Sequence, residues 1–179
     1  MAADDLLLRQ APHSPQAEQA VLGSMLIDPD CIKDVMDKLQ PEDFYLRANR
    51  DIFETIYHMF IYSRPIDGVT VAGEMERNGV YNDNTRDYLV QLMDVTPTSA
   101  NVMEYVKIVL DKSLMRQVAA AAGSITAMVQ EGNGDAGDML ESAEQKVYAI
   151  RRGRSAQNMV TVSMVLQDVM NHLAELTAS

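Results

Sequence analysis

The sequence predicts an all-α fold, in which a compact bundle of short helices is followed by a long projecting helical hairpin and a C-terminal helix. Apolar residues recur every three or four positions through the long segments, which is the spacing of a helix with one buried face. No long run alternates between apolar and polar residues as a half-buried strand would. Apolar residues make up 47% of the 179 residues, which is enough to fill the core of one domain of ordinary size.

The first helix is predicted to begin after Ser14, in the stretch HSPQAEQAVLGSM. Serine is a favoured N-cap, and Pro15 suits the first helical position because its missing N–H has no helical partner there. Small side chains such as Ala17 recur on one face of this helix and predict close packing against a neighbour. Asp28 and Pro29 repeat the cap-and-proline signal, and they predict a second helix directly after the first.

The middle of the chain predicts three more short helices. Residues 47–62 carry a broad apolar stripe, and the sequence SRPIDG ends that helix. Thr70 is predicted to cap a helix that ends at Asn78 and Gly79, since glycine is favoured just after a helix. Asn84 is predicted to cap the next helix, and the sequence TPTS then breaks the chain.

The longest predicted helix runs from Ala100 to about Glu131, without a proline, and spans about 45 Å at ~1.5 Å per residue. The sequence GNGDAG at 132–137 turns the chain, and a second helix runs from Asp138 to Ile150. A projecting pair of amphipathic helices leaves apolar surface uncovered, so we expect a second copy of the chain to cover it. The alternative is that this surface packs only against its own returning helix. The residues expected in self-association are Val106, Val109, Leu114, Val118, Ala121, Ala122, Ile125, Met128 and Val147.

These patterns give a domain organisation for the whole chain. Residues 1–13 are predicted to be a flexible N-terminus, 14–100 the helical bundle, and 101–152 the hairpin. Residues 153–159 are predicted to be a flexible link, and 160–176 a last amphipathic helix. The apolar side of this last helix carries Val162, Val165, Leu166, Val169 and Leu173.

The net charge of -11 bears on possible ligands. A surface this acidic repels phosphate backbones, so we expect no strong direct binding of nucleic acid. A basic cluster at Arg151, Arg152 and Arg154 leaves an alternative open, in which the chain is an accessory nucleic-acid-binding helical module. The plainer interpretation is a solvated helix end, where cations suit the helix dipole.

The sequence contains no constellation of residues typical of an enzyme. His13, His58 and His172 do not stand at metal-ligand spacing, and the glycine-rich EGNGDAGD lacks the Lys-Ser or Lys-Thr of a phosphate-binding loop. The single cysteine, Cys31, excludes an intramolecular disulfide and a cysteine-based zinc site. We therefore expect no catalytic, cofactor-binding or metal-binding residues. Without a signal peptide or a membrane-spanning run, we expect a cytoplasmic protein.

Four segments resemble, in order and spacing, the N-terminal part of the bacterial replicative DNA helicases of the DnaB family. The first is SPQAEQAVLGSMLIDPD, and the second is PEDFYLRANRDIFETI. The third is RPIDGVTVAGEMERNG, and the fourth, PTSANVMEYVKIVLDKSLMR, resembles the start of the family's long hairpin helix. The resemblance extends from Ser14 to about Ile150, and the helix at 160–176 is similar in position to the linker helix that joins the two halves of these helicases.

This resemblance implies an N-terminal domain with its linker helix, without the RecA-like ATPase domain. In that family paired hairpins form the collar of a hexameric ring, so we expect a dimer of this chain alone and a hexamer of the full-length protein. The resemblance also implies docking of the C-terminal domain of primase, for which Tyr88 and Ile125 are candidate contacts. Unwinding, ATP and Mg²⁺ belong to the absent motor domain, and the linker helix is expected to dock on a neighbouring motor domain. Asn49 stands where some members carry histidine, and we expect little consequence because both residues can cap helices.

Overall fold

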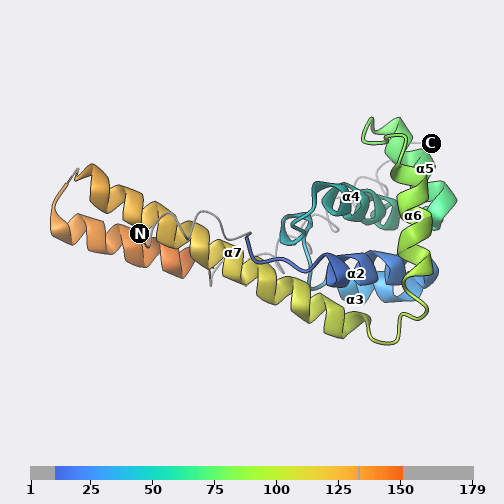
Figure 1. Ribbon diagram of the computed structural model, residues 1–179, viewed down its shortest axis with the longest axis horizontal. Coiled ribbons are helices and arrows are strands. Elements are labelled where there is room, and N and C mark those ends of the chain that lie inside the picture. Colours follow the sequence, from blue (N-terminus) through green and yellow to red (C-terminus); the bar gives the residue numbers. More distant parts are fainter. Residues whose placement is uncertain (1–10, 133, 151–179) are drawn as a thin grey trace, which may run out of the picture. The chain divides into compact units, whose positions relative to one another are not determined.

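The computed structural model describes residues 11–132 and 134–150, and the chain divides into two units between Arg116 and Gln117. The described residues form helices, turns and loops without any strand, which confirms the all-α prediction (Figure 1). The predicted link at 153–159, the last helix at 160–176 and the arginine cluster after residue 150 lie outside the described residues. The five docking residues predicted on that last helix lie outside them as well.

The first unit consists of short helices and the beginning of one long helix. They are α2 (Pro15–Ile27), the 3₁₀ turn η1 (Pro29–Cys31), α3 (Ile32–Met36), the 3₁₀ turn η2 (Pro41–Asp43), α4 (Arg47–Ile61), α5 (Gly68–Arg77), α6 (Thr85–Asp94) and the start of α7 (Val102–Glu131). The second unit contains the rest of α7 and a returning helix at 136–150. Within the described residues, no helix is both long enough and apolar enough to cross a membrane.

Local signals in the sequence set some of the helix starts, whereas Asn84 holds the predicted N-cap position of α6 without a capping bond from its side chain. The Ser14 hydroxyl accepts the backbone N–H of Ala17 at 3.4 Å, with proline at the first helical position, as predicted. Asp28 caps the following element by accepting the N–H of Asp30 at 3.2 Å. That element begins as a 3₁₀ turn and continues as α3 only to Met36, so the predicted second helix is shorter and less regular than its spacing indicated.

At α5 the predicted cap is wrong by three positions. The N-cap is Asp67, whose carboxylate accepts the N–H groups of Val69 at 2.8 Å and of Thr70 at 2.9 Å. The Thr70 hydroxyl in turn accepts the N–H of Asp67 at 2.9 Å, which completes a reciprocal capping box. Thr70 therefore contributes to the helix start from the third helical position.

Close contact between α2 and α6 depends on Gly23. A Cβ atom built there would lie 2.2 Å from Thr96 Oγ1 and 2.3 Å from the carbonyl oxygen of Leu92. Only a residue without a side chain allows the end of α6 to approach the backbone of α2 this closely. The same two helices supply fully buried apolar side chains, including Leu22 and Leu92, to the core.

The first two turns of α7 belong to the core of the first unit. Val102 is 6% exposed, and Val106 and Val109 are each 1% exposed. These side chains complete the core, so the first unit continues to Arg116, whereas the sequence pattern placed the end of the bundle at residue 100. A periodic apolar stripe continues smoothly across this point and does not mark where the core ends.

In the second unit every described side chain is half-buried or exposed. The chain turns after α7 through Gly132 at φ 64° and Gly134 at φ 120°, where the backbone adopts values that favour glycine (Figure 1). Half-buried positions recur on one side of each helix, as expected for two helices that pack along one another. They are Ala121, Ile125 and Met128 on α7, and Met139, Ser142, Ala143 and Ile150 on the returning helix.

Candidate interaction surfaces

A buried carboxylate organises the first unit. Glu18 is 1% exposed, and its oxygens accept the backbone N–H groups of Tyr45 at 2.8 Å and of Leu46 at 3.3 Å. They also accept Nδ2 of Asn49 at 2.8 Å. Leu46, the N-cap position of α4, has no capping side chain of its own, so Glu18 of α2 supplies the negative charge at this helix start.

Asn49 continues this network into α6. Its side chain is completely buried, and its Oδ1 accepts the hydroxyl of Tyr88 at 2.6 Å. Gln19 Nε2 donates to the same tyrosine oxygen at 3.3 Å. Asn49 therefore joins α2, α4 and α6, and it is not a helix cap, contrary to the interpretation from sequence. Burial raises the pKa of Tyr88, and the two amides partly oppose that rise.

The same network reaches the last turn of α7 within the first unit. The hydroxyl of Ser113 donates to Asp43 Oδ1 at 2.6 Å. Arg116 donates from Nη1 to the carbonyl oxygen of Pro12 at 2.9 Å and from Nη2 to the carbonyl oxygen of Asp43. Its guanidinium lies 5.7 Å from the centre of the Tyr45 ring. Burial lowers the pKa of Arg116, while the carboxylates of Glu18 and Asp43 raise it, and arginine stays charged.

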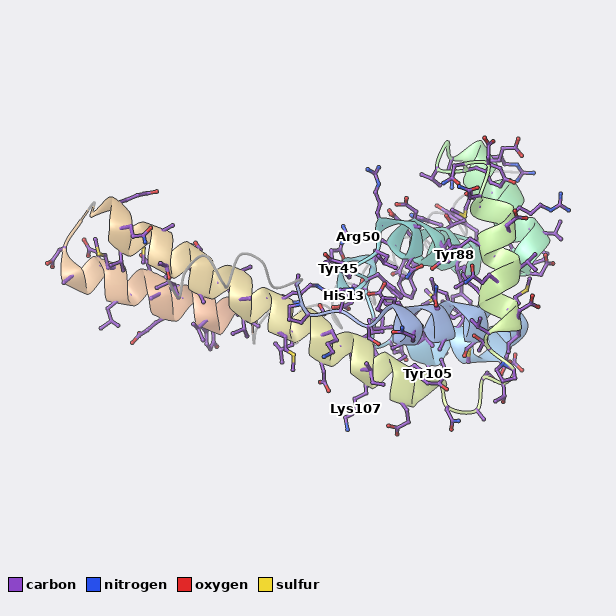
Figure 2. All side chains as sticks on the ribbon, in the orientation of Figure 1. His13, Tyr45, Arg50, Tyr88, Tyr105 and Lys107 are labelled. Carbon is purple, nitrogen blue, oxygen red and sulfur yellow. The ribbon has the colours of Figure 1, made fainter. Side chains whose placement is uncertain are left out.

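An aromatic pair lies beside this arginine. The ring of His13 stacks on the ring of Tyr45 with a centroid distance of 4.3 Å, and the two residues lie next to one another in Figure 2. Arg50 on α4 donates from Nη2 to the carbonyl oxygen of Phe44 at 3.0 Å. Side chains from the N-terminal segment, α2, α4 and α7 thus hold the base of the long helix in place. The sequence pattern does not reveal this network, because most of its partners stand 27 to 104 residues apart in the sequence.

A cleft of about 410 Å³ lies along α4 and α5 in the first unit, and its lining includes Glu54, His58 and Glu74. Glu74 is occupied by two arginines, Arg64 at 2.7 Å and Arg77 at 3.1 Å. Among the residues that the structure describes, no three histidine, cysteine, aspartate or glutamate side chains are grouped to hold a metal ion.

The predicted self-association residues fall into three environments. Val106 and Val109 are core residues of the first unit, so they offer no surface to a second chain, and this part of the prediction is corrected. The half-buried residues are Leu114, Ala121, Ile125 and Met128. Val118 at 52% and Val147 at 53% are more than half exposed, and Ala122 is exposed as well.

Further apolar side chains are exposed on the hairpin and were not predicted. On α7, Val129 is 59% exposed and stands seven residues after Ala122, on the same face. On the returning helix, Leu140 and Tyr148 are each 63% exposed. The seven-residue spacing from Leu140 to Val147 is the signal in the sequence that could have identified this second apolar face.

The candidate primase contacts lie in different settings. Ile125 is half-buried on the inner side of the hairpin, together with Ala121 and Met128. Tyr88 is half-buried in the first unit, where its hydroxyl is bonded to Asn49 and Gln19. A partner that contacts Tyr88 meets its ring, since the hydroxyl is turned into the network.

Comparison with known proteins decides the family. The family model for the DnaB-like helicase N terminal domain matches residues 10–111, more than half of the chain. The chain belongs to the DnaB-like helicase N-terminal domain family. This confirms the resemblance seen in the four sequence segments, and the matched residues lie within the first unit, which includes the start of α7.

Relatives with this domain are replicative DNA helicases. The chain is 33% identical over 177 residues to the replicative DNA helicase DnaB of Mycobacterium leprae (strain TN). This match covers 96% of this chain and 29% of the relative. It is 32% identical over 149 residues to the replicative DNA helicase DnaB of Pasteurella multocida (strain Pm70). This match covers 82% of this chain and 32% of the relative. The chain therefore spans about a third of the length of these DnaB helicases.

Solved structures agree with this assignment. The crystal structure of the N-terminal domain of DnaB helicase from Mycobacterium tuberculosis is similar with a TM-score of 0.72 and 35% identity, covering 79% of this chain and 99% of that domain. The N-terminal domain of DnaB helicase from Helicobacter pylori, which interacts with primase, has a TM-score of 0.58 over 64% of this chain and 90% of that domain. At 23% identity this second likeness supports the fold alone.

Proposed function

We propose that this chain is the oligomerisation and primase-docking domain of a replicative DNA helicase, and that it forms part of a collar on a hexameric ring. The observation that carries the proposal is the exposed apolar surface of a hairpin unit in which no described side chain is buried. Apolar side chains that are more than half exposed on both helices are typical of a surface that another protein covers.

Self-association is assigned to the exposed face of α7 in the second unit. This assignment keeps Val118 and Ala122 from the predicted residues, adds Val129, and omits the buried Val106 and Val109. Residues 117–130 carry no charged side chain. Two copies can therefore bring this face together without placing like charges next to one another. One self-complementary contact of this kind closes on itself with two-fold symmetry, and we expect a dimer of the chain alone.

Sedimentation equilibrium of the chain and of Val118→Asp tests this assignment. The parent is expected to reach the mass of a dimer as its concentration rises, while the variant stays a monomer because it places an unpaired charge in the interface. A matched control, Val69→Asp, changes a side chain that is 77% exposed on the first unit and should not change the mass. A Val118→Asp variant that associates like the parent would contradict the assignment.

Docking of primase is proposed by analogy with the Helicobacter pylori domain. Titration with the C-terminal domain of primase from the same organism tests it, with binding expected at micromolar concentrations and absence of binding contradicting it. Tyr88 and Ile125 remain candidate contacts within this proposal.

The remaining activities belong to the whole helicase. We propose that ATP, Mg²⁺ and unwinding belong to a motor domain outside this chain, and that the segment at 160–176 docks on a neighbouring motor domain. Such a helicase would work with the chromosome in the cytoplasm.

A further inference from the structure

The short segment before α2, residues 11–13, contacts the base of α7 within the first unit. The carbonyl oxygen of Pro12 accepts Nη1 of Arg116 at 2.9 Å. The ring of His13 stacks on the ring of Tyr45, in the loop before α4, with a centroid distance of 4.3 Å (Figure 2). The guanidinium of Arg116 lies 5.7 Å from the centre of the same tyrosine ring. The segment, the loop and the helix therefore meet around one aromatic side chain.

This segment is attached without a buried side chain of its own. Residues 11–13 are all half-buried, and the first buried residue in the described part of the chain is Ala17, inside α2. Segments that bury few apolar groups are the ones that open locally while the rest of a protein stays folded. Residues 11–13 can therefore leave the surface while the apolar core stays closed.

The sequence of this segment restricts its freedom when it is not attached. Prolines stand at positions 12 and 15, and each one fixes its own φ and limits the residue before it. His13 also donates from Nδ1 to the carbonyl oxygen of Ala11 at 2.6 Å, a local bond that orients its ring. A chain that has few conformations to lose is ordered at a small entropic cost, so a few contacts are enough to hold it.

The last turn of α7 in the first unit is held by polar contacts. Among the described residues of α7, Ser113 is the last buried one, and its hydroxyl donates to Asp43. Arg116 shares its donors between the carbonyl oxygens of Asp43 and Pro12. If the segment leaves, one donor of a half-buried guanidinium loses its acceptor, which disfavours the attached position of the side chain. The order of residues 113–116 therefore depends in part on the segment before α2.

We propose that residues 11–13 are a strap that opens and closes as a unit on the base of α7 and controls the order of residues 113–116. In the closed state the strap holds Arg116 and covers part of the Tyr45 ring. In the open state the ring is more exposed and the last turn of α7 in the first unit is loosened. The coupling is reciprocal, because the strap and the helix share one arginine. This device requires neither a second copy of the chain nor primase.

Hydrogen exchange of the full chain, followed by NMR at one low protein concentration, tests the effect of the strap on the helix. In Pro12→Gly/His13→Ala the backbone of the strap is freed and the stack on the tyrosine is removed, while the carbonyl group at position 12 is kept. Amides of residues 113–116 are expected to exchange about fivefold faster than in the parent, the effect of roughly one lost hydrogen bond. Amides of Phe53 and Leu89, whose side chains are buried in the core, should keep their rates.

A matched control makes the same two replacements elsewhere in the first unit. Pro65→Gly/His58→Ala changes exposed residues and should leave the exchange of residues 113–116 as it is in the parent. Unchanged exchange of these amides in the strap variant, or equal acceleration in the control, would overturn the inference. Equal acceleration of Phe53 and Leu89 in the strap variant would show that the segment opens only with the whole unit, which also overturns it.

The ring protons of His13 report the reverse effect, of the helix on the strap. Stacking on Tyr45 moves their NMR signals upfield, and Arg116→Ala is expected to reduce this shift by about half or more because the strap loses its anchor. Arg116→Lys should give a smaller reduction, since it keeps the charge without the two-pronged donor. Lys107→Ala, at an exposed position of the same helix, should leave the shift unchanged. A full upfield shift in both Arg116 variants would show that the segment is held without α7 and overturn the inference.

Discussion

The two units of this chain are stabilised in different ways. The first unit buries a full apolar core and a carboxylate, Glu18, which has three hydrogen-bond donors from α4 and the loop before it. The second unit has no buried side chain among its described residues, and several apolar ones are more than half exposed. The first unit therefore contains the interactions that specify its own structure, whereas the described residues of the second expose apolar side chains on both helices.

The long helix α7 belongs to both units, since the division between them falls between Arg116 and Gln117. Its first turns are held by core packing at Val106 and Val109 and by the hydrogen bonds of Ser113 and Arg116. Beyond Gln117 the same helix has no buried position. One continuous helix is thus fixed at its base by a folded unit, while its far end buries no side chain.

The largest effect on the first unit is expected from Glu18→Ala. This change leaves two backbone N–H groups and the Asn49 amide without an acceptor in a buried site, at a cost of about 1–3 kcal/mol of unfolding free energy for each unsatisfied group. Urea denaturation measures the loss. The exposed control Glu76→Ala should stay within about 0.5 kcal/mol of the parent. Equal stability of the two variants would remove Glu18 from the centre of the unit.

A smaller loss is expected from Gly23→Ala. The new Cβ would meet Thr96 Oγ1 at 2.2 Å and the Leu92 carbonyl oxygen at 2.3 Å, so α2 and α6 must separate at a cost of about 1–3 kcal/mol. Gly73→Ala is a matched control on α5, since its Cβ meets nothing within 4 Å. That control should gain about 0.5–1 kcal/mol because alanine favours a helix. Thermal unfolding that ranks the two variants in the opposite order would contradict the packing described for Gly23.

Tyr88→Phe separates the structural role of the hydroxyl from a role in docking. The variant leaves Asn49 Oδ1 without its donor, and we expect a loss of about 1–2 kcal/mol in urea denaturation. Binding of the primase C-terminal domain should be unchanged, because the ring is retained. Weaker binding with unchanged stability would instead place the hydroxyl on the docking surface.

The smallest effect concerns pH and the cap of α5. Hydrogen bonds from the N–H groups of Thr70 and Val69 lower the pKa of Asp67 below its ordinary value of 3.8. The charged cap therefore contributes stability above pH 3.8, and this contribution is lost as the pH falls through the lower pKa of the folded state. Relative to Asp67→Ala, the parent should be about 1 kcal/mol more stable at neutral pH, and the difference should shrink in acid. A difference that stays constant down to pH 2 would show that the charge of Asp67 has no part in it.

Local sequence signals predicted the helices well but not the interactions that hold them together. Ser14 and Pro15 mark the start of a helix, and the structure confirms this start. The N-cap of α5 was predicted at Thr70, but it is Asp67, because both residue types are capable caps. The Glu18 network was missed altogether, since nothing in the spacing of a single sequence pairs a carboxylate with an amide 31 residues away.

Helical periodicity also could not separate buried from exposed apolar residues on α7. Val109 and Val118 both fit the predicted apolar stripe, yet Val109 is 1% exposed and Val118 is 52% exposed. The difference arises from the neighbours that tertiary structure provides, and the repeat along one helix carries no information about them. Family membership came from the order of the four segments, and the comparisons confirm it.

Hydrogen exchange as a function of protein concentration tests the contrast between the units most directly. Amides of the first unit are expected to exchange at the same rate at every protein concentration. Amides of residues 117–130 should become more protected as the concentration rises, because a second copy then covers this part of α7. Equal protection of residues 117–130 in dilute and concentrated samples would contradict the claim that this surface is completed by another molecule.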